Sequence, residues 1–423
     1  MAEQVRSLQT GIKYKDTPVG QIPVDWETVN LKNVSQKFLN GGKPDTTNKE
    51  YWNGNIPWVT GADFENQKIY KIRRYITSKG LENSASNVVP KGNLLIVTRT
   101  GVGKLAIAPF DIAISQDITG VILDREKALT EYLYWYLNYN KDRLKSIIQG
   151  TSINGLLRKD IELFPVVLPA IPEQKKIAEI LTTVDEAIEK TAQIIEKTRE
   201  LKKGLMQKLL TRGIGHTKFK KTEIGEIPEE WEVTRLKNIV QRFYNGGTPN
   251  IAKREYWDGD IPFITGADFE NQKIIRIRRY ITNKGVENSA TNVIPEGNLL
   301  IVTRTGVGKI AIAPFDIAIS QDITGIILNA EKALPEYLYW FLNYKADKLR
   351  SIIQGTSING LLRGDLEFFN VILPPTEEQK KIAKILTSID DEIEKELNHR
   401  EQLQLLKKSL MEILLTGKVR VAV

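Results

Sequence analysis

The feature that most constrains this chain is an internal repeat that takes up nearly its whole length. Residues near 11–217 align with residues near 216–422 at a constant offset of 205, without an insertion or deletion. The run Arg99–Leu123 differs from Arg304–Leu328 at only two positions. Each copy is far longer than one turn of a solenoid, so each is expected to be a globular domain with its own core.

Each copy ends in a long amphipathic stretch, which in the first copy is Leu168–Arg212. Apolar residues recur there every three or four positions with charges between them, which predicts a helix with one narrow apolar seam, as in a coiled coil. Pro172 suits the first turn, and Gly213 follows the last. The expected seam residues are Ile177, Leu181, Val184, Ile188, Ile195, Leu201, Leu205 and Leu209. The stretch returns as Leu373–Thr416, so we expect two such helices.

The remainder of each copy has the pattern of a mixed α and β domain. Short β-rich runs are separated by Gly, Pro and Asp turns, and the pattern changes to a helical period over Thr130–Ile148. The strands expected in the first copy are Trp26–Leu31, Ile56–Thr60, Lys68–Tyr75, Leu94–Thr98, Leu105–Ala108, Ile112–Ser115, Ile118–Leu123 and Glu162–Leu168. We therefore expect an α+β chain with two similar α/β domains, at 1–167 and 216–372, each followed by a long helix, at 168–215 and 373–423.

Composition excludes several classes of protein. The chain has 423 residues, 41% of them hydrophobic and 26% charged, which is typical of globular domains. No apolar run is long enough to cross a bilayer, and the polar N-terminal sequence is not a signal peptide. Cysteine is absent, which excludes disulfides and thiolate chemistry and favours a cytoplasmic location.

The two histidines, His216 and His399, lie in a polar linker and on a polar helix face, where we expect both side chains to be solvated. A histidine triad or a zinc site is therefore not expected. The net charge of +8 permits an anionic partner such as nucleic acid but does not identify one.

The sharpest local motif is Thr98–Lys104, which returns as Thr303–Lys309. Two glycines beside a lysine can let the backbone approach a phosphate. The run is not a Walker A loop, because Thr98 stands where the first glycine is needed and Leu105 follows the lysine. The alternative interpretation is a tight hairpin with exposed polar residues.

Three other polar segments have the chemistry to contact DNA, and each also has a structural explanation. Ser115-Gln116-Asp117 offers an amide for adenine edges, or it is a turn before the next strand. Gln149–Asn154 could contact the DNA backbone, or it is the loop after a helix. The basic cluster of Arg73, Arg74 and Lys79, repeated as Arg278, Arg279 and Lys284, could equally be a solvated face.

The candidate DNA-binding residues, including those of the Asn-Gly-Gly loop, are Gly41, Gly42, Lys43, Arg73, Arg74, Arg99, Thr100, Gly101, Gly103, Lys104, Gln116, Gln149, Thr151 and Asn154, with Gly246, Gly247, Thr248, Arg278, Arg279, Arg304, Thr305, Gly306, Gly308, Lys309, Gln321, Gln354, Thr356 and Asn359 in the second copy. The aromatic set Tyr132, Tyr134, Trp135, Tyr136 and Tyr139 is expected mostly to pack a helix. Scattered carboxylates fix no acid–base pair or metal site, and no methyltransferase motif is present. We expect no catalytic residues and no cofactor bound by this chain.

Taken together, these pieces resemble a type I restriction–modification specificity subunit. The entry phrase Tyr14–Trp26 resembles the opening of that family, and it recurs more closely as Thr222–Trp231. The strand–Pro–Glu-Gln–Lys–Ile–Ala entry to the long helix, at Leu168–Ala178 and Leu373–Ala383, is also characteristic. The resemblance covers nearly the whole chain, and the doubled architecture is more specific than any one motif.

The resemblance implies two target recognition domains, near 15–167 and 220–372. It also implies two conserved helices, at 173–212 and 378–416, packed antiparallel as a spacer with approximate two-fold symmetry. Such a subunit does no chemistry. It binds double-stranded DNA and two modification subunits, which carry S-adenosylmethionine and methylate adenine. With restriction subunits it directs an ATP- and Mg-dependent translocase and nuclease. We expect the modification subunits to dock on outer helix faces that carry Lys175, Lys176 and Glu189.

Helices of about 40 residues would span roughly 60 Å. Two like domains related by a two-fold axis should read inverted half-sites about one helical turn apart, so we expect an interrupted palindrome or near-palindrome. The loop at Lys43–Asn48 differs from Thr248–Lys253, and Trp58 becomes Phe263, so the half-sites could differ by a base. The alternatives are a nucleotide-phosphate-binding enzyme that uses Arg99–Lys104, a coiled-coil scaffold and, least favoured, a single-chain methyltransferase.

Overall fold

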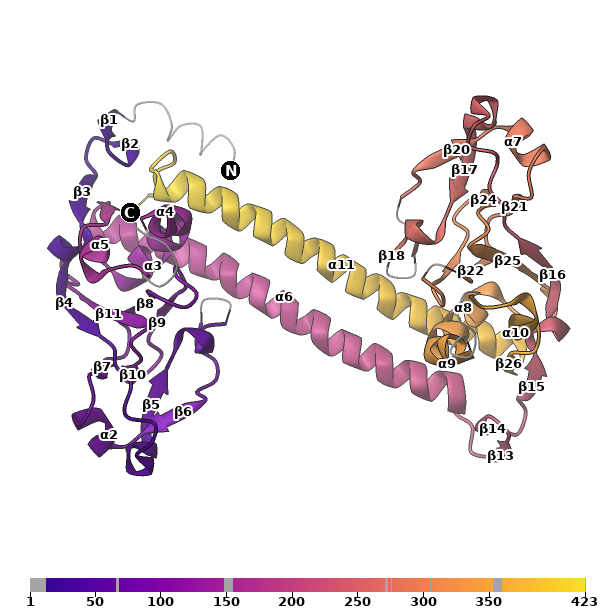
Figure 1. Cartoon of the computed structure of the whole chain (residues 1–423), viewed down its shortest axis with the longest axis horizontal. Coiled ribbons are helices and arrows are strands. Elements are labelled where there is room, and N and C mark those ends of the chain that lie inside the picture. Colours follow the sequence, from indigo (N-terminus) through magenta and orange to yellow (C-terminus); the bar gives the residue numbers. More distant parts are fainter. Residues whose placement is uncertain are drawn as a thin grey trace. The chain divides into compact units, whose positions relative to one another are not determined.

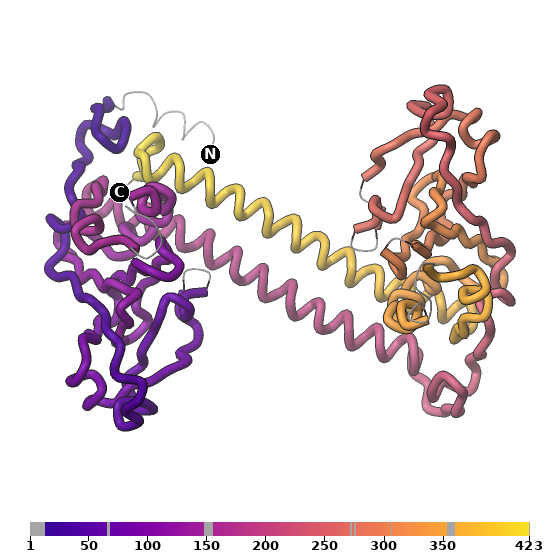
Figure 2. Tube along the Cα trace, in the orientation of Figure 1, coloured from indigo at the N-terminus to yellow at the C-terminus, as the bar shows by residue number. Residues whose placement is uncertain are grey.

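The computed structural model describes residues 13–65, 68–147, 155–270, 273–274, 276–304, 306–352 and 360–422 (Figures 1 and 2). Its contacts divide the chain into two compact units. Unit 1 is Met1–Ala192 with Asn398–Val423, and unit 2 is Gln193–Leu397. Each unit thus contains one α/β domain and a part of each long helix. The α+β class expected from the sequence is confirmed.

Unit 1 is built on two four-stranded sheets. Their orders are β6-β5-β10-β7 and β4-β11-β8-β9, and all neighbours are antiparallel except β5 and β10. The strands are β1 (Tyr14–Thr17), β2 (Gly20–Pro23), β3 (Glu27–Asn30), β4 (Ser35–Asn40), β5 (Trp52–Val59), β6 (Arg74–Ile76), β7 (Asn87–Val89), β8 (Leu94–Val97), β9 (Leu105–Ile107), β10 (Ile112–Ile114), β11 (Ile118–Leu123) and β12 (Pro165–Leu168). The strand expected over Lys68–Tyr75 is therefore mostly wrong, since β6 begins only at Arg74.

The β4-β11-β8-β9 sheet is buried on both faces. Along β8, Leu94 and Ile96 enter the core that is shared with the helices, whereas Leu95 and Val97 enter the core between the two sheets. This alternation follows from the two-residue period of a strand. It explains why the uninterrupted apolar run Leu94–Val97 forms a strand rather than a helix.

Short helices complete the domain, and they are α2 (Ser78–Glu82), α3 (Thr130–Tyr139), α4 (Lys141–Ser146) and α5 (Arg158–Glu162), with 3₁₀ turns η1 (Leu31–Val34), η2 (Lys49–Tyr51) and η3 (Gly61–Asp63). The single helix expected over Thr130–Ile148 is wrong, because the chain bends at Asn140 between α3 and α4. The last strand is also shorter than expected, since Arg158–Glu162 is helical. As expected, the aromatic side chains of α3 pack the core, and only Tyr139 is exposed.

The two long helices are α6 (Ile171–Arg212) and α11 (Thr376–Leu415). In unit 1, Ile177 and Leu181 of α6 pack in one core with Leu414 and Leu415 of α11. In unit 2, Leu209 and Leu210 pack with Ile382, Ala383 and Leu386. In both units the beginning of one helix meets the end of the other, so the two segments in each unit run antiparallel.

One seam residue was assigned wrongly from the sequence. Leu201 is 55% exposed, and its neighbour Lys202 takes the inward position instead. In unit 2 Lys202 pairs with Asp390, and its Nζ lies 4.7 Å from the ring centroid of Trp340. In unit 1 Lys407 makes the equivalent contacts: its Nζ donates to Asp185 over 2.6 Å and lies 4.7 Å from the Trp135 ring. We call these two clusters the seam lysine pairs.

The Glu-Gln motif that opens each long helix attaches the domain to it. In unit 1 Glu173 is 1% exposed, and its carboxylate accepts from Trp26 Nε1 at 3.0 Å and from the Arg420 guanidinium at 2.7 and 2.8 Å. Gln174 accepts from the Leu129 backbone N–H at the start of α3, over 2.9 Å, and its amide donates to two carbonyls. These buried bonds fix how the α/β domain sits on its helix.

Unit 2 repeats this architecture. Its strands are β13 (Phe219–Thr222), β14 (Gly225–Pro228), β15 (Glu232–Arg235), β16 (Val240–Asn245), β17 (Trp257–Ile264), β18 (Phe269–Glu270), β19 (Lys273–Ile274), β20 (Arg279–Ile281), β21 (Asn292–Ile294), β22 (Leu299–Val302), β23 (Ile310–Ile312), β24 (Ile317–Ile319), β25 (Ile323–Leu328) and β26 (Asn370–Leu373). Its helices are η4 (Leu236–Asn238), η5 (Arg254–Tyr256), η6 (Gly266–Asp268), α7 (Asn283–Glu287), α8 (Pro335–Tyr344), α9 (Ala346–Ser351) and α10 (Arg363–Glu367).

Two further expectations about side chains need correction. His216 is not a solvated linker residue: its Nε2 lies 3.0 Å from both carboxylate oxygens of Glu378, the unit 2 counterpart of Glu173. His399 is exposed, as expected. Glu189 is not on a free helix face, because Lys68 and Tyr70 of the same unit bind its carboxylate. Lys175 and Lys176 are exposed.

Candidate nucleic-acid interface

The Thr98–Lys104 motif is the turn of a hairpin. It joins the antiparallel strands β8 and β9, and Val97 N–H donates to the Lys104 carbonyl over 2.9 Å. Gly101 and Gly103 have φ of 87° and 86°, a backbone conformation that other L-residues rarely adopt. The hairpin interpretation is therefore confirmed, and it places Arg99 and Thr100 on the exposed turn.

The two cations of this turn are used differently. Lys104 Nζ donates to the carbonyls of Gly61 and Phe64, at 3.1 and 3.3 Å, and Lys309 repeats both bonds with Gly266 and Phe269. Arg99 and Arg304 are exposed, and neither has an ion pair or a hydrogen bond to a described residue. A free guanidinium can bind a phosphate in bidentate fashion. Arg99 and Arg304 are thus the available cations, whereas the lysines tie the hairpin to the domain.

The Ser115–Asp117 turn lies directly beside this hairpin. The Asp117 carbonyl accepts from the Thr98 backbone N–H at 2.7 Å and from its hydroxyl at 3.1 Å. Ser115 is buried, but Gln116 is exposed, and Gln321 is exposed in unit 2. The turn therefore presents one amide side chain to solvent next to the Arg99 turn.

The Asn-Gly-Gly loop reaches the same surface from β4. A Cβ added at Gly41 would lie 1.8 Å from the Ser115 carbonyl oxygen, and one at Gly42 would lie 2.3 Å from the carbonyl carbon of Ala85. Close backbone approach thus accounts for both glycines. The Gly42 carbonyl also accepts from Trp58 Nε1 over 3.1 Å, a bond that Phe263 cannot make in unit 2.

The residue after the two glycines differs between the units. Lys43 is exposed in unit 1. Its counterpart Thr248 is half-buried and donates its hydroxyl to Gln321 Oε1. The contact brings the loop and the turn together in unit 2, and it occupies the amide oxygen of Gln321.

The adjacent residues Arg73 and Arg74 differ in whether they form an ion pair. Arg73 donates through Nε to Asp63, whose side chain is buried, and through Nη2 to the Thr60 hydroxyl at 3.0 Å. Burial raises the pKa of Asp63, but the hydrogen bonds from Arg73 and Thr60 outweigh it and lower that pKa. Arg74 has no ion pair with a described residue and lies 5.9 Å from the Trp52 ring centroid. Arg278 and Arg279 repeat this division, so Arg74 and Arg279 are the available cations.

The Gln149–Asn154 and Gln354–Asn359 candidates, and Thr305, lie outside the described residues. The described chain that follows the first of these segments contacts the hairpin. Leu156 N–H donates to the Thr98 carbonyl over 2.7 Å, and Gly155 packs on the same carbonyl so closely that a Cβ there would lie 1.7 Å from it.

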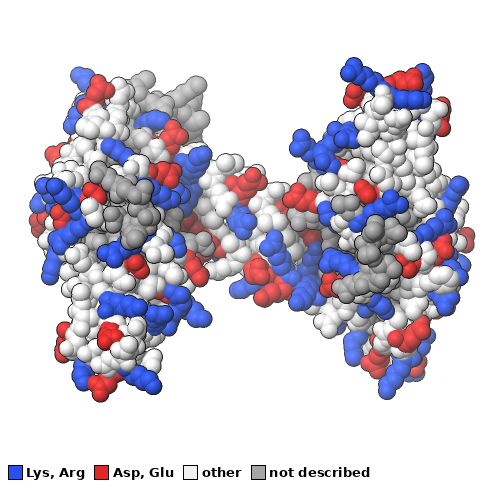
Figure 3. Space-filling view, viewed as in Figure 1, with Lys and Arg blue, Asp and Glu red and all other residues white. Residues whose placement is uncertain are grey.

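In each unit the structure thus brings together the hairpin turn, the Ser-Gln-Asp turn and the Asn-Gly-Gly loop. Arg74 and Arg99, like their counterparts in unit 2, have no ion pair with a described residue. Figure 3 shows Lys and Arg side chains in clusters on the visible face of each unit, with acidic side chains among them. Among the described residues, no group of three or more His, Cys, Asp or Glu could hold a metal ion. Within the same ranges, no helix is both long and apolar enough to span a membrane.

Known proteins share this doubled organisation. The family model described as "Type I restriction modification DNA specificity domain" matches residues 23–198 and again residues 228–404. A putative type I restriction enzyme MjaX specificity subunit of Methanocaldococcus jannaschii is 32% identical over 427 residues, which cover 96% of this chain and 97% of that protein. The type I restriction enzyme MjaVIII specificity subunit of the same organism is 29% identical, over 95% of this chain and 94% of that protein.

The fold is also similar to a solved structure. The S subunit of a type I restriction–modification system from M. genitalium aligns with a TM-score of 0.64, over 96% of this chain and 97% of that chain. The sequence identity is 15%, so this likeness concerns the fold alone.

Proposed function

Because this chain belongs to the family of type I restriction–modification DNA specificity subunits, we propose that it reads a bipartite DNA site whose halves are nearly the same. The chain is the DNA-binding, non-catalytic subunit of a type I restriction enzyme, with two target recognition domains. The proposal goes further, since it assigns one half-site to each unit. We place its action in the cytoplasm, where the DNA of the cell lies.

The observation that carries the proposal is that both units present equivalent loops with two equivalent free arginines and an equivalent exposed glutamine. Arg99 and Arg304, Arg74 and Arg279, and Gln116 and Gln321 occupy equivalent exposed positions. Two protein surfaces with the same DNA-contacting side chains are expected to bind the same base sequence. Two such surfaces that are related by an approximate two-fold axis would read an interrupted palindrome or near-palindrome.

The long helices support a fixed gap between the half-sites. The α6 and α11 segments pack antiparallel within each unit, and a seam lysine pair holds their register in each. We propose that they act as a spacer that sets a gap of about one turn of DNA. The exposed faces around Lys175 and Lys176 would bind two modification subunits.

The chemistry would belong to those partners. The modification subunits would carry S-adenosylmethionine and methylate adenine, and restriction subunits would use ATP and Mg. The domain boundaries near 167, 215 and 372 belong to this proposal as well.

The test is co-purification with a methyltransferase encoded next to this chain, followed by methylation mapping on random duplexes. We expect two half-sites that are inverted copies, or differ at one position, at a fixed separation. Two unrelated half-sites would contradict the near-palindrome.

A double substitution tests the free cations. Arg99→Ala with Arg304→Ala should weaken DNA binding by the assembled complex. It should also reduce the slope of log K against log salt by about 2, since each phosphate contact contributes roughly 0.9. The matched control is Lys15→Ala with Lys220→Ala, which removes the same charge from the β1–β2 hairpin and its repeat. Equal salt slopes in the two variants would remove the Arg99 turn from the interface.

A further inference from the structure

The loop between β4 and β5 has the same backbone in both units but a different residue at its tip. In unit 1 the Asp45 carboxylate accepts from the Thr47 backbone N–H at 2.9 Å, and its carbonyl accepts from Trp52 Nε1 at 2.9 Å. In unit 2 the Asn250 side chain accepts from Ala252 N–H at 3.0 Å, and its carbonyl accepts from Trp257 Nε1 at 3.2 Å. The residue that each loop holds at its tip is Thr46 in unit 1 and Ile251 in unit 2.

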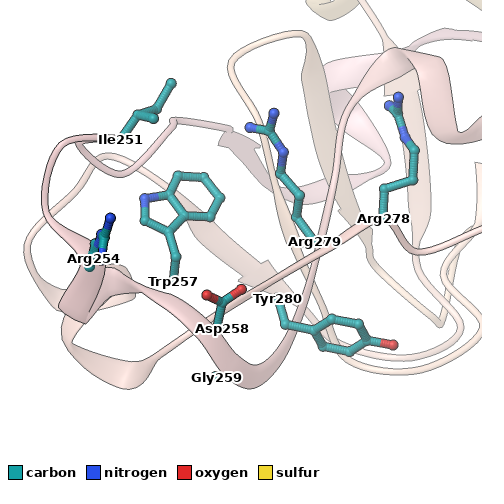
Figure 4. Close-up of a pocket in the computed structure, with 8 residues that line it drawn as sticks. All are labelled: Ile251, Arg254, Trp257, Asp258, Gly259, Arg278, Arg279 and Tyr280. Atoms are coloured by element: carbon teal, nitrogen blue, oxygen red, sulfur yellow. The ribbon is translucent and has the colours of Figure 1, made fainter.

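The tip of the second loop borders a pocket of about 600 Å³, which is lined by arginine and aromatic side chains and by Asp258 (Figure 4). Ile251 lies on one side of the Trp257 indole, and the Arg279 guanidinium lies 5.5 Å from the ring centroid. Arg254 lines the same pocket, and neither Arg254 nor Arg279 has an ion pair with a described residue. Two free guanidinium groups in one open pocket suit a phosphate of the DNA backbone.

The apolar side chain of Ile251 itself cannot bind a phosphate. Its side chain is 69% exposed, more than any other large apolar residue in the described part of the chain, although the positions around it are polar or small. A base edge in the major groove offers only one apolar group, the C5-methyl of thymine. Thr46, at the equivalent position, carries a hydroxyl that can exchange a hydrogen bond with a base edge.

We propose that residue 46 and residue 251 are the specificity-determining positions that make the two half-sites differ. Ile251 packs against a thymine methyl while Arg254 and Arg279 hold a neighbouring phosphate, and Thr46 forms a polar contact at the matching place in the first half-site. This inference rests on the proposed reading of one half-site by each unit. The inference depends on the rigidity of the loop. A side chain that is held in one position can discriminate between bases, whereas a mobile side chain would adapt to several of them.

The test replaces each thymine of the selected site in turn with deoxyuridine, which lacks only the C5-methyl, and measures binding by the complex with its methyltransferase. One replacement in the second half-site should weaken binding by about fourfold, which corresponds to one buried methyl group. The same replacement should have no effect on the Ile251→Ser variant, which has no methyl group, and a retained effect on Ile251→Val. A Thr46→Ile variant should acquire a thymine preference in the first half-site.

The inference is overturned if no replacement weakens wild-type binding, or if Ile251→Ser remains equally sensitive to it. Either result would be compatible with the proposal that each unit reads one of two related half-sites. Failure of the proposed function is distinguishable, because the wild-type complex would then select no pair of related half-sites at all. Site selection with Thr46→Ile provides a second measurement, and an unchanged first half-site would also overturn the assignment.

Discussion

The seam lysine pairs give a prediction whose magnitude follows from the structure. In unit 1 Lys407 Nζ lies 2.6 Å from Asp185 Oδ1, and the two side chains are 22% and 21% exposed. Exposed ion pairs contribute about 0.2–1 kcal/mol, whereas breaking a fully buried pair costs about 3–5 kcal/mol. We therefore expect a coupling free energy of about 1.5 kcal/mol between Lys407 and Asp185.

A double-mutant cycle measures this coupling directly. The variants are Lys407→Ala, Asp185→Ala and the double variant. The chain has two units and is not expected to unfold in one step, so native-state hydrogen exchange of amides in α6 and α11 is the suitable assay. Each single variant should lower the opening free energy of these helices, and the double variant should lower it by less than the sum.

The chain also provides a matched control pair. Lys79 and Glu50 form the same kind of ion pair on the surface, but their side chains are 60% and 66% exposed. Their coupling should be clearly smaller than that of Lys407 with Asp185, because water and salt screen an exposed ion pair. If the Lys407–Asp185 coupling is no larger than that of the control, the seam lysine does not hold the helices in register, and burial is not what distinguishes the two pairs.

Three further predictions concern the domains and the spacer. Lys104→Met should lower stability by about 1 kcal/mol through loss of two carbonyl contacts, while the salt slope of DNA binding stays that of the wild type. The lowered pKa of Asp63 means that its stabilising pair is complete above the ordinary value of 3.8 and is lost as pH falls through the lower folded value. The difference in opening free energy between wild type and Asp63→Asn, measured by native-state hydrogen exchange of amides in unit 1, should therefore be constant at neutral pH and shrink below about pH 4. Inserting one helical turn into both α6 and α11 should lengthen the gap in the methylated site and leave the half-site bases unchanged; altered bases at an unchanged gap would refute the spacer.

The elements that were predicted correctly are those that local patterns determine. The period of apolar residues identified α6 and α11 to within three residues at each end. The hairpin, which was the alternative interpretation of Thr98–Lys104, is what β8 and β9 form. The repeat predicted two units before any strand was assigned. Each of these signals lies within a short stretch of sequence or in its recurrence, so no tertiary information is needed to find it.

The errors arise where a contact between distant segments decides the outcome. Apolar periodicity does not predict a lysine in the seam between two helices. The pattern therefore assigns Leu201 to the seam, although its neighbour Lys202 occupies that position. His216 appeared solvated because Glu378, which binds it, is far along the chain. Arg73 and Arg74 are identical and adjacent in the sequence, yet only a tertiary contact with Asp63 decides which of them is free.

The repeat separates the residues that hold the recognition surface from those that can read DNA. Interactions that occur twice at equivalent positions, such as Lys104 with Gly61 and Lys309 with Gly266, belong to the shared scaffold. A side chain that differs between copies while its supporting bonds remain the same has no such structural constraint. Residue 46 and its counterpart Ile251 meet this criterion, because the Asx turn and the indole hydrogen bond are preserved around them. Differences between the half-sites should therefore map to such tips, whereas substitutions in the repeated contacts should change stability and leave both half-sites unaltered.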